Sequence, residues 1–421
     1  MCANRRDRPS STQDRVLNQV VDALKRTDAG DPLHLVTRPD GDEAAIVHHT
    51  LLTILRRQAS LDWVLTSNAT GRIRPRTRRV LRWGLAQILY LRSLAPELAA
   101  DTCVRFVRRR YAVREAGFVN ALLRRLVDRG CEKLLADVTR DAPDDVRLEL
   151  SNVLLKRWRK RLSAEELTRL SRAHLEPVPV TVRQRREVDD PGSLGLRPLQ
   201  DVTWARDQPM WVCDAPAAFL RSSALHEGHF YVQDPATLLA PTLLAVEAGD
   251  RCADLCAAPG GKTLMLSEAA GEAGRVVCCD RSWPRLRVLR ENTDSAPNCQ
   301  VVCADAGRAP FAKGTFDRVL LDVPCSNTGV IRRRPDVRWR FSEEGLADVV
   351  RLQARILDEA QALVRPGGFL VYSTCSVEPE ENAQQTQRFL DSHPKFALQK
   401  AVQLLPDRDH DGAYAALLLR A

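Results

Sequence analysis

Short apolar runs that alternate with helical stretches constrain the fold of this chain more than any other feature. From about Tyr231 onward these runs are RCADLCA, GRVVCCD, CQVVCAD, FDRVLLDVP and GGFLVYSTC. Strands and helices that alternate in this way build a mostly parallel sheet with helices on both faces. We therefore expect residues 231–421 to form a doubly wound α/β domain, with its ligands at the carboxyl ends of the strands.

The first part of the chain predicts helices instead. From Gln13 to about Arg129 the apolar residues recur at helical spacing and strand signals are few. In DRVLNQVVDALKR the residues on one face are Val16, Leu17, Val20, Val21 and Leu24. Arginines crowd the polar faces in two runs, Arg72, Arg74, Arg76, Arg78 and Arg79, then Arg108 to Arg110. Because the net charge is +9, two interpretations stay open, a solvated helix face and a surface for RNA phosphates.

Residues 141–230 form a mixed region. The stretch LLKRWRKRLSAEELTRL predicts a basic helix, PVPVTVRQRREV predicts a strand after a proline-marked turn, and EVDDPGSLGLRP predicts a loop. A chain of 421 residues is too long for one ordinary domain. We expect three domains: a helical domain at 1–140, a small α+β accessory module at 141–230 and the α/β domain at 231–421.

Composition narrows the setting in which such a chain works. No stretch approaches the apolar length that spans a bilayer, and the N-terminus MCANRRDRPSSTQD lacks the apolar core of a secretory signal. The 12 cysteines contain no C-x-x-C pair, and the histidines do not cluster beside them. Most of these thiols lie in apolar runs, as small core residues do in a reducing cytoplasm. We expect a cytoplasmic protein with no metal site.

A glycine-containing loop follows the first strand of the α/β domain. The stretch DLCAAPGGKT, Asp254 to Thr263, opens a helix, and its glycines let backbone N–H groups approach an anionic ligand. A nucleotide-binding P-loop needs a glycine five positions before Gly261, where this chain has Cys256. The spacing of a dinucleotide-binding G-x-G-x-x-G is missing as well.

Acids recur at the ends of the following strands. Asp280 ends GRVVCCD, Asp305 ends CQVVCAD and Asp322 follows the next apolar run, so with Asp254 four strands carry one each. A single strand-end aspartate is usually a cap or turn residue. Four in succession indicate a cofactor that contains a nucleoside, because such acids bind ribose hydroxyls in this kind of fold.

Two cysteines occupy the same kind of position. Cys325 follows the run that ends in Asp322, and Cys375 ends the strand in YSTCS. A buried cysteine is more often inert packing than a reactive group. Here each thiol lies past the apolar run and precedes a serine, which favours the polar mouth of a site.

Three long motifs together resemble those of a known family. DLCAAPGGKT, LLDVPCSNTGVIRRRPDVRW and YSTCSVEPEEN are similar to motifs of the RNA (cytosine-C5) methyltransferases, in the bacterial ribosomal-RNA branch of the RsmB (Sun/Fmu) type. QILYLR and GFVNALLRRL resemble the NusB-type domain of that branch, and YVQDPAT matches at the start of the catalytic domain. The resemblance implies a Rossmann-like, S-adenosylmethionine-dependent methyltransferase domain behind an all-α NusB-like domain.

The resemblance also implies roles for individual residues. Cys375 is the expected nucleophile that adds to C6 of cytosine, Cys325 assists proton removal and product release, and Asp322 binds the cytosine edge near N3 or lies close to the cofactor. Asp280 is expected at the ribose hydroxyls and Asp305 at the adenine side. The loop around the amino-acid part of S-adenosylmethionine comprises Cys256, Ala257, Ala258, Pro259, Gly260, Gly261 and Lys262. Lys262 contacts either the cofactor or RNA phosphate.

The expected partner is small-subunit (16S) ribosomal RNA, which a monomer of this chain would bind. The arginines Arg332 to Arg334 are expected to contact its backbone, with a solvated loop as the other interpretation. Two departures put target choice in doubt: Arg183, Gln184 and Arg185 stand where the family has R-x-N, and DGAY, with Ala413, replaces DGFF. We expect the second departure to repack the last hairpin without affecting the chemistry.

Three rival functions stay open. A non-enzymatic RNA-binding factor is disfavoured because both cysteines and all four acids are present. A methyltransferase of the same fold that acts on nitrogen needs no nucleophilic thiol, so Cys375 discriminates against it. The same chemistry on a tRNA cytosine is the nearest rival, and the NusB-type domain favours ribosomal RNA over it.

Overall fold

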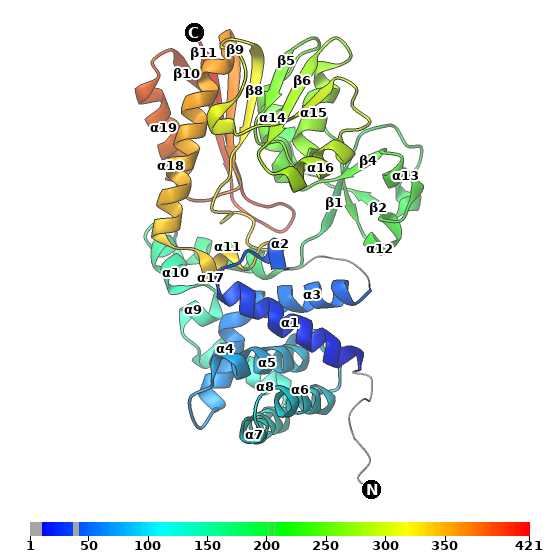
Figure 1. Ribbon diagram of the computed structural model, residues 1–421, viewed down its shortest axis with the longest axis vertical. Helices are drawn as coiled ribbons and strands as arrows, with labels where there is room; N and C mark the ends of the chain where they lie inside the picture. Colours follow the sequence, from blue (N-terminus) through cyan, green and yellow to red (C-terminus); the bar gives the residue numbers. More distant parts are fainter. Residues whose placement is uncertain (1–10, 37–41, 201, 206) are drawn as a thin grey trace. The chain divides into compact units, whose positions relative to one another are not determined.

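The computed structural model describes residues 11–36, 42–200, 202–205 and 207–421. It divides into two compact units, and both are drawn in Figure 1. The helical unit comprises Met1–Leu175 together with Arg334–Phe341, and the catalytic unit comprises Glu176–Arg333 and Ser342–Ala421. The three predicted domain ranges stay a sequence-based division. Among the described residues, no helix combines the length and apolarity that crossing a membrane requires.

The helical unit consists of helices joined by short turns, as its sequence periodicity predicted. The predicted apolar face of the first helix is buried throughout, from Val16 to Leu24. That helix begins at Ser11, whose hydroxyl accepts a hydrogen bond from the Asp14 N–H at 3.2 Å. Its helices are α1 (Thr12–Asp28), α2 (Leu33–Val36), α3 (Asp42–Arg56), α4 (Gln58–Asn68), α5 (Pro75–Ala86), the π-helical turn η1 (Gln87–Leu91), α6 (Pro96–Arg110), α7 (Val113–Arg129), α8 (Cys131–Asp141), α9 (Asp144–Arg147), α10 (Asn152–Arg159), α11 (Ala164–Leu175) and α17 (Val337–Arg340).

Helix α17 joins this unit from a distant part of the sequence. The Arg338 side chain is fully buried and donates to the Arg56 carbonyl at 3.0 Å and to the His174 carbonyl at 2.8 Å. These carbonyls lie in the last turns of α3 and α11, where helix dipoles favour a cation. The Trp339 indole donates to the Leu55 carbonyl at 2.8 Å. The segment Arg334–Phe341, a few residues after Cys325 and Ser326, is therefore part of the core of the helical unit.

A small antiparallel sheet opens the catalytic unit and confirms the predicted α+β module. Among the described residues its strand order is β2-β3-β1-β4. The strands are β1 (Val180–Gln184), β2 (Leu196–Pro198), β3 (Met210–Cys213) and β4 (Phe230–Val232), with the short helices η2 (Pro191–Leu194), η3 (Thr203–Ala205), α12 (Pro216–Phe219) and α13 (Ser223–His226) around them. Its core is small and packs Val182, Phe219 and Phe230 together.

The large sheet confirms the doubly wound prediction. In the described residues it has seven strands in the order β10-β11-β9-β8-β5-β6-β7. Neighbours from β9 to β7 pair in parallel, while β11 pairs antiparallel with both β9 and β10. The strands are β5 (Arg251–Asp254), β6 (Arg275–Asp280), β7 (Cys299–Cys303), β8 (Phe316–Asp322), β9 (Val364–Thr374), β10 (Phe396–Leu404) and β11 (Ala413–Arg420).

Helices cover both faces of this sheet, and alternate strand residues separate the two cores. Leu321 packs with α18 and α19 on one face, whereas its neighbour Leu320 packs with α14 and α15 on the other. The helices are η4 (Pro235–Leu238), α14 (Leu239–Leu244), α15 (Gly261–Ala270), α16 (Trp283–Asn292), η5 (Ala306–Arg308), α18 (Glu343–Ala360), η6 (Gln361–Leu363) and α19 (Ala383–Ser392). Figure 1 shows α18 and α19 beside β9 to β11.

The strand order reverses between β5 and β8. From β5 the chain continues to β6 and β7 on one side, and it then returns to place β8 on the other side. Ligands bind outside the carboxyl ends of strands at such a switch point. Asp254 ends β5 and Asp322 ends β8, so the sheet topology brings two of the predicted strand-end acids to this point.

Candidate active site

The two strand-end cysteines lie side by side. Cys325 follows β8 and Cys375 follows β9, and these strands pair in parallel up to Asp322 opposite Ser373. The two sulfur atoms are 2.9 Å apart, and both residues are half-buried. Two thiols that are 50 residues apart in the sequence thus lie next to each other at the same edge of the sheet.

Their surroundings keep Cys325 protonated. Its hydrogen bond to Cys375 is the largest influence, burial adds to it, and the nearby Glu381 charge acts in the same direction, so the pKa of Cys325 lies well above the ordinary thiol value. Asn327 bridges the pair: its side-chain N–H donates to the Cys325 carbonyl at 2.8 Å, and its Oδ1 accepts from the Cys375 thiol at 3.4 Å. Asn327 has a φ of 63°, which asparagine tolerates better than most residues.

Asp322 is paired with the lysine of the glycine-containing loop. Lys262 Nζ donates to Asp322 Oδ2 at 2.6 Å. Burial by itself lowers the pKa of Lys262, but the charge and hydrogen bond of Asp322 outweigh it, and the pKa lies above the ordinary lysine value. Lys262 is therefore charged at neutral pH. The structure brings these two predicted residues together directly beside the β8 end.

The glycine-containing loop forms a tight cradle at the start of α15. Gly260 is the N-cap with a φ of 116°, and a Cβ there would lie 3.0 Å from Leu289 Cδ1. Loop carbonyls are held from α16: Arg285 donates to the Ala258 carbonyl, and Asn292 donates to the Pro259 carbonyl at 2.8 Å. The N–H groups of the first helical turn have no intrahelical acceptor and carry the positive end of the helix dipole.

Asp254 lies beneath this loop. Its Oδ2 accepts a hydrogen bond from the Thr263 hydroxyl at 2.7 Å. Burial raises the pKa of Asp254 to about 7, against the opposing effect of that hydrogen bond.

The other two strand-end acids also bond locally. Asp280 is buried at the end of β6, with Oδ1 accepting from the Ser282 N–H at 2.9 Å and Oδ2 3.0 Å from Arg285 Nη1. Asp305 is exposed, and its Oδ1 accepts from the Gly307 N–H at 2.9 Å. Asp280 thus uses one oxygen in a local turn and one in an ion pair, and Asp305 uses one oxygen to cap η5. A carboxylate has about four acceptor positions, so both keep capacity for a ligand.

The arginines behind the PCS motif do not all face solvent. Arg332 is fully buried, with Nε donating to Asp411 Oδ1 at 2.5 Å and Nη1 to the Asp407 carbonyl at 2.9 Å. The expectation that Arg332 contacts RNA was wrong, because a buried guanidinium bonded to a buried carboxylate has no face for phosphate. Arg333 and Arg334 are exposed, and their RNA contact stays a prediction.

The departure in the middle module has a structural explanation. Arg183 is 1% exposed, and its guanidinium donates to Glu268 Oε2 on α15 at 2.7 Å. Arg185 donates to the same carboxylate at 2.6 Å. These two arginines therefore connect β1 to α15, a helix that packs against the large sheet. Ala413, at the other departure, is buried at the start of β11 and packs in the core against α14.

Sequence reasoning missed two residues that shape the thiol pair, Asn327 and Glu381. Both lie inside the quoted motifs, in PCSNTG and in EPEEN. The available signal was that each is a polar residue inside one of the two cysteine-containing motifs, although its distance along the sequence does not show that it lies near either thiol.

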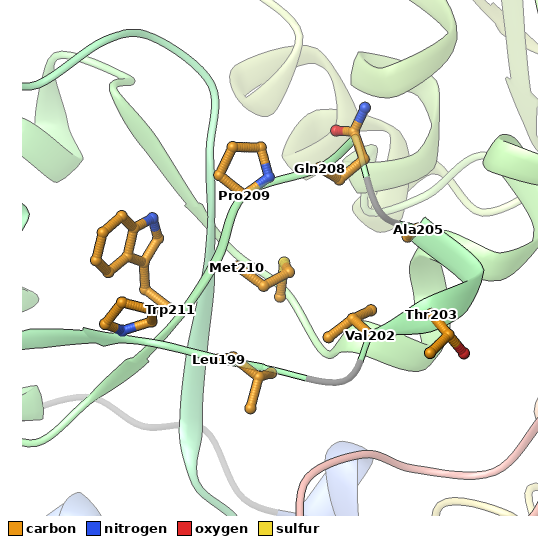
Figure 2. A pocket seen from close by; sticks show the side chains of 9 residues that line it. Leu199, Val202, Thr203, Ala205, Gln208, Pro209, Met210 and Trp211 are labelled. Atoms are coloured by element: carbon orange, nitrogen blue, oxygen red, sulfur yellow. The ribbon is translucent and has the colours of Figure 1, made fainter.

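Two further findings concern a cavity outside the site and the grouping of possible metal ligands. A cavity of about 440 Å³ lies in the small antiparallel module, and none of its lining residues belongs to the strand-end site. Figure 2 shows it with the labelled residues Leu199, Val202, Thr203, Ala205, Gln208, Pro209, Met210 and Trp211. Within the described ranges, no three His, Cys, Asp or Glu side chains are grouped to hold a metal ion.

Comparisons with known proteins agree with this geometry. Residues 241–418 match the family model for 16S rRNA methyltransferase RsmB/F, and residues 10–128 match the NusB family. Ribosomal RNA small subunit methyltransferase B of Salmonella arizonae is 32% identical over 402 residues, which cover 90% of this chain and 91% of that protein. Its Vibrio cholerae counterpart is 44% identical over 203 residues, 46% of each chain.

A solved structure shows the same fold. The crystal structure of PH0851 matches with a TM-score of 0.76 at 23% identity, covering 96% of this chain and 98% of that one. The near-complete coverage by the Salmonella protein, together with the two family models, establishes the relationship. This chain belongs to the RsmB-type 16S ribosomal RNA methyltransferase family with an N-terminal NusB domain.

Proposed function

We propose that this protein methylates C5 of a cytosine in 16S ribosomal RNA through a covalent bond between Cys375 and C6 of the base. The single observation that carries the proposal is the pair of thiols, 2.9 Å apart at the ends of adjacent strands. A methyltransferase acting on nitrogen needs no nucleophilic thiol at this point. An inert structural pair would be expected within the core, not half-buried at the switch-point edge of the sheet.

The chemistry needs a nucleophile because C5 of cytosine is a poor one. When the Cys375 sulfur bonds to C6, the ring becomes an enamine whose C5 can attack a methyl group. As the sulfur adds, the proton lost by the Cys375 thiol is taken up at N3, where Asp322 accepts a hydrogen bond from the N3–H and so steadies the charge that develops on the ring. Removal of the C5 proton then expels the Cys375 sulfur and restores the aromatic ring.

Cys325 assists the last steps. Its pKa is raised, and its S–H lies against the Cys375 sulfur. As the C5 proton leaves, the protonated Cys325 thiol can give its own proton to the departing Cys375 sulfur and take up the C5 proton in its place. This exchange removes the C5 proton, releases the product and returns Cys325 to its protonated state.

S-adenosylmethionine would supply the electrophilic methyl group, and the residues present fit it. The amide cradle at Gly260 and Gly261, where a Cβ would collide, suits the amino-acid part with its carboxylate. Asp280 would accept from the ribose hydroxyls, and Asp305 would lie at the adenine side. Lys262 would hold the Asp322 carboxylate in place between cofactor and base, as its 2.6 Å hydrogen bond indicates.

The test compares Cys325→Ala and Cys375→Ala. Each variant is incubated with unmodified small-subunit ribosomal RNA and S-adenosylmethionine, then run on a denaturing gel. A protein–RNA adduct that persists in Cys325→Ala and disappears in Cys375→Ala is the expected result, because the first variant still forms the bond but releases it slowly. The reverse pattern would exchange the two roles. No adduct in either variant, with the cofactor still bound, would reject the covalent reaction on this RNA.

A further inference from the structure

A buried carboxylate lies behind the two thiols. Glu381, in the loop between β9 and α19, is 0% exposed. Its Oε1 accepts from the Ser326 N–H at 2.8 Å and from Gln353 Nε2 at 2.9 Å. Its Oε2 accepts from the hydroxyls of Ser326 and Ser376. Ser326 and Gln353 come from the loop after β8 and from α18, whereas Ser376 lies in the same loop as Glu381, so this one side chain ties its own loop to two other segments of the catalytic unit.

The bonded serines are the residues directly after the two thiols. Ser326 follows Cys325 and Ser376 follows Cys375. Glu381 therefore links the two backbone segments that carry the cysteines. Without it, the loops after β8 and β9 would keep a smaller set of contacts, such as the Gly329 N–H to the Cys375 carbonyl at 3.0 Å.

Glu381 is itself held firmly. Gln353, on α18, also donates to the Pro324 carbonyl at 2.9 Å, directly before Cys325. The buried Tyr372 hydroxyl lies 2.6 Å from the Glu381 carbonyl oxygen and 3.1 Å from Gln353 Oε1. The cysteine loops are thus tied to a network that α18 and β9 fix.

Burying a carboxylate is costly, and its four donors offset that cost. Burial raises the pKa of Glu381 against the effect of those hydrogen bonds. A hydrophobic residue would fill the same space without this cost. We attribute the carboxylate to its position between the two thiol loops, where it can hold both reacting groups in place. Misplacing a reacting group by about 1 Å can reduce a rate by about 100-fold.

We propose that Glu381 is a positioning residue that sets the mutual placement of Cys325 and Cys375. The inference rests on the proposed function, because it assumes that both thiols take part in the reaction. Glu381 touches neither cytosine nor cofactor in this role. It acts through the backbone of the residues that follow the thiols.

The test uses two substitutions at the same position in the full chain. Glu381→Gln keeps Oε1 for the two N–H donors, and its Nε2 can donate to the two serine hydroxyls, which accept as well as donate. Glu381→Ala removes every contact. We expect Glu381→Ala to lower kcat by about 100-fold, with KM for the RNA and Kd for S-adenosylmethionine changed less than about twofold. Glu381→Gln should restore most of kcat.

A matched control is Gln385→Ala. Gln385 is also buried and lies on α19; its side chain donates to the Val350 carbonyl at 3.1 Å and accepts from Arg388 Nε at 3.1 Å, and neither partner belongs to a thiol loop. Its kcat should stay near that of the parent. If Gln385→Ala loses as much kcat as Glu381→Ala, the effect is general loosening and the proposal is wrong. Ser376→Ala, which deletes one Glu381 contact, should lower kcat by a smaller factor and serves if Glu381→Ala does not fold.

Adduct formation separates this proposal from the one on which it rests. Cys325→Ala alone tests the covalent reaction. If it forms the RNA adduct, the double variant Cys325→Ala with Glu381→Ala should form it more slowly, since Cys375 is displaced. An equal rate would overturn the positioning of Cys375. If neither Cys325→Ala nor Cys375→Ala forms an adduct, the covalent proposal fails, whereas a kcat loss in Glu381→Ala that glutamine restores would still support a positioning role.

Discussion

Replacing Arg332 with methionine distinguishes a structural arginine from one that binds RNA. Methionine keeps much of the side-chain volume and removes the charge. In the parent, the fully buried guanidinium bonds to Asp411, to the carbonyls of Asp407 and Arg408, and at 3.4 Å to Asp234. The substitution leaves Asp411 and Asp234, both under 10% exposed, with Arg333 as their shared cation.

The expected loss follows from this geometry. Breaking a buried ion pair by removing one partner costs about 3 to 5 kcal/mol. Arg333 still bonds to both carboxylates, which places the cost toward the lower end, but two backbone carbonyls also lose their donor at about 1 kcal/mol each. We therefore expect about 5 kcal/mol. With a urea m-value of about 3 kcal/mol/M, the unfolding midpoint of the catalytic unit falls by about 1.7 M.

The assay is urea unfolding of the full chain, monitored by tryptophan fluorescence and by circular dichroism. Arg334→Met is the control, because Arg334 is exposed and its substitution should change stability by less than about 0.5 kcal/mol. Acid should reduce the difference between Arg332→Met and the parent. Burial already raises the pKa of Asp411. Once Asp411 is protonated it carries no charge for the guanidinium to balance, so the loss of Arg332 lowers stability by less.

Two results would refute this reasoning. A variant that unfolds at the parent midpoint would show that the buried ion pair does not stabilise the unit. A variant with normal stability and weakened binding of small-subunit RNA would restore the original interpretation of Arg332 as a phosphate contact.

Three further predictions concern the cofactor, pH and RNA. Asp280→Asn should weaken S-adenosylmethionine binding by about 1.5 to 3 kcal/mol, roughly 10- to 150-fold, in a calorimetric titration; equal affinity would remove Asp280 from the site. Because the folded pKa of Asp254 is about 7, above its unfolded value, its contribution to stability is lost as pH rises from about 4 through 7, and Asp254→Asn should flatten that decline in unfolding midpoints. Replacing the exposed Arg72 and Arg108 by serine should reduce the salt slope of RNA binding by about 2, whereas an unchanged slope would mean that they only solvate helices.

The last experiment uses the full chain for a structural reason. Removing the helical domain would expose α17, whose Arg338 and Trp339 are bonded to carbonyls up to 284 residues away. A truncated chain would therefore differ from the parent in more than its RNA-binding surface. Point substitutions avoid this difficulty.

The sequence by itself determined the architecture and the positions along the chain of the candidate site residues. Strand and helix periods are local, so they placed the α/β rhythm and the helical face from Val16 to Leu24 correctly. Successive parallel strands end at one edge of a sheet, and this rule was enough to bring Asp254 and Asp322 together. Cys325 and Cys375 met for the same reason.

Only the tertiary structure decided which charged residues serve the fold. The run of arginines reads as one group in the sequence, yet Arg332 is buried on Asp411, 79 residues away, and Arg338 is buried in another unit. Glu381 bonds to Ser326 across 55 residues. Burial and partners of this kind depend on contacts between distant segments, and no local pattern of charge or hydrophobicity records them.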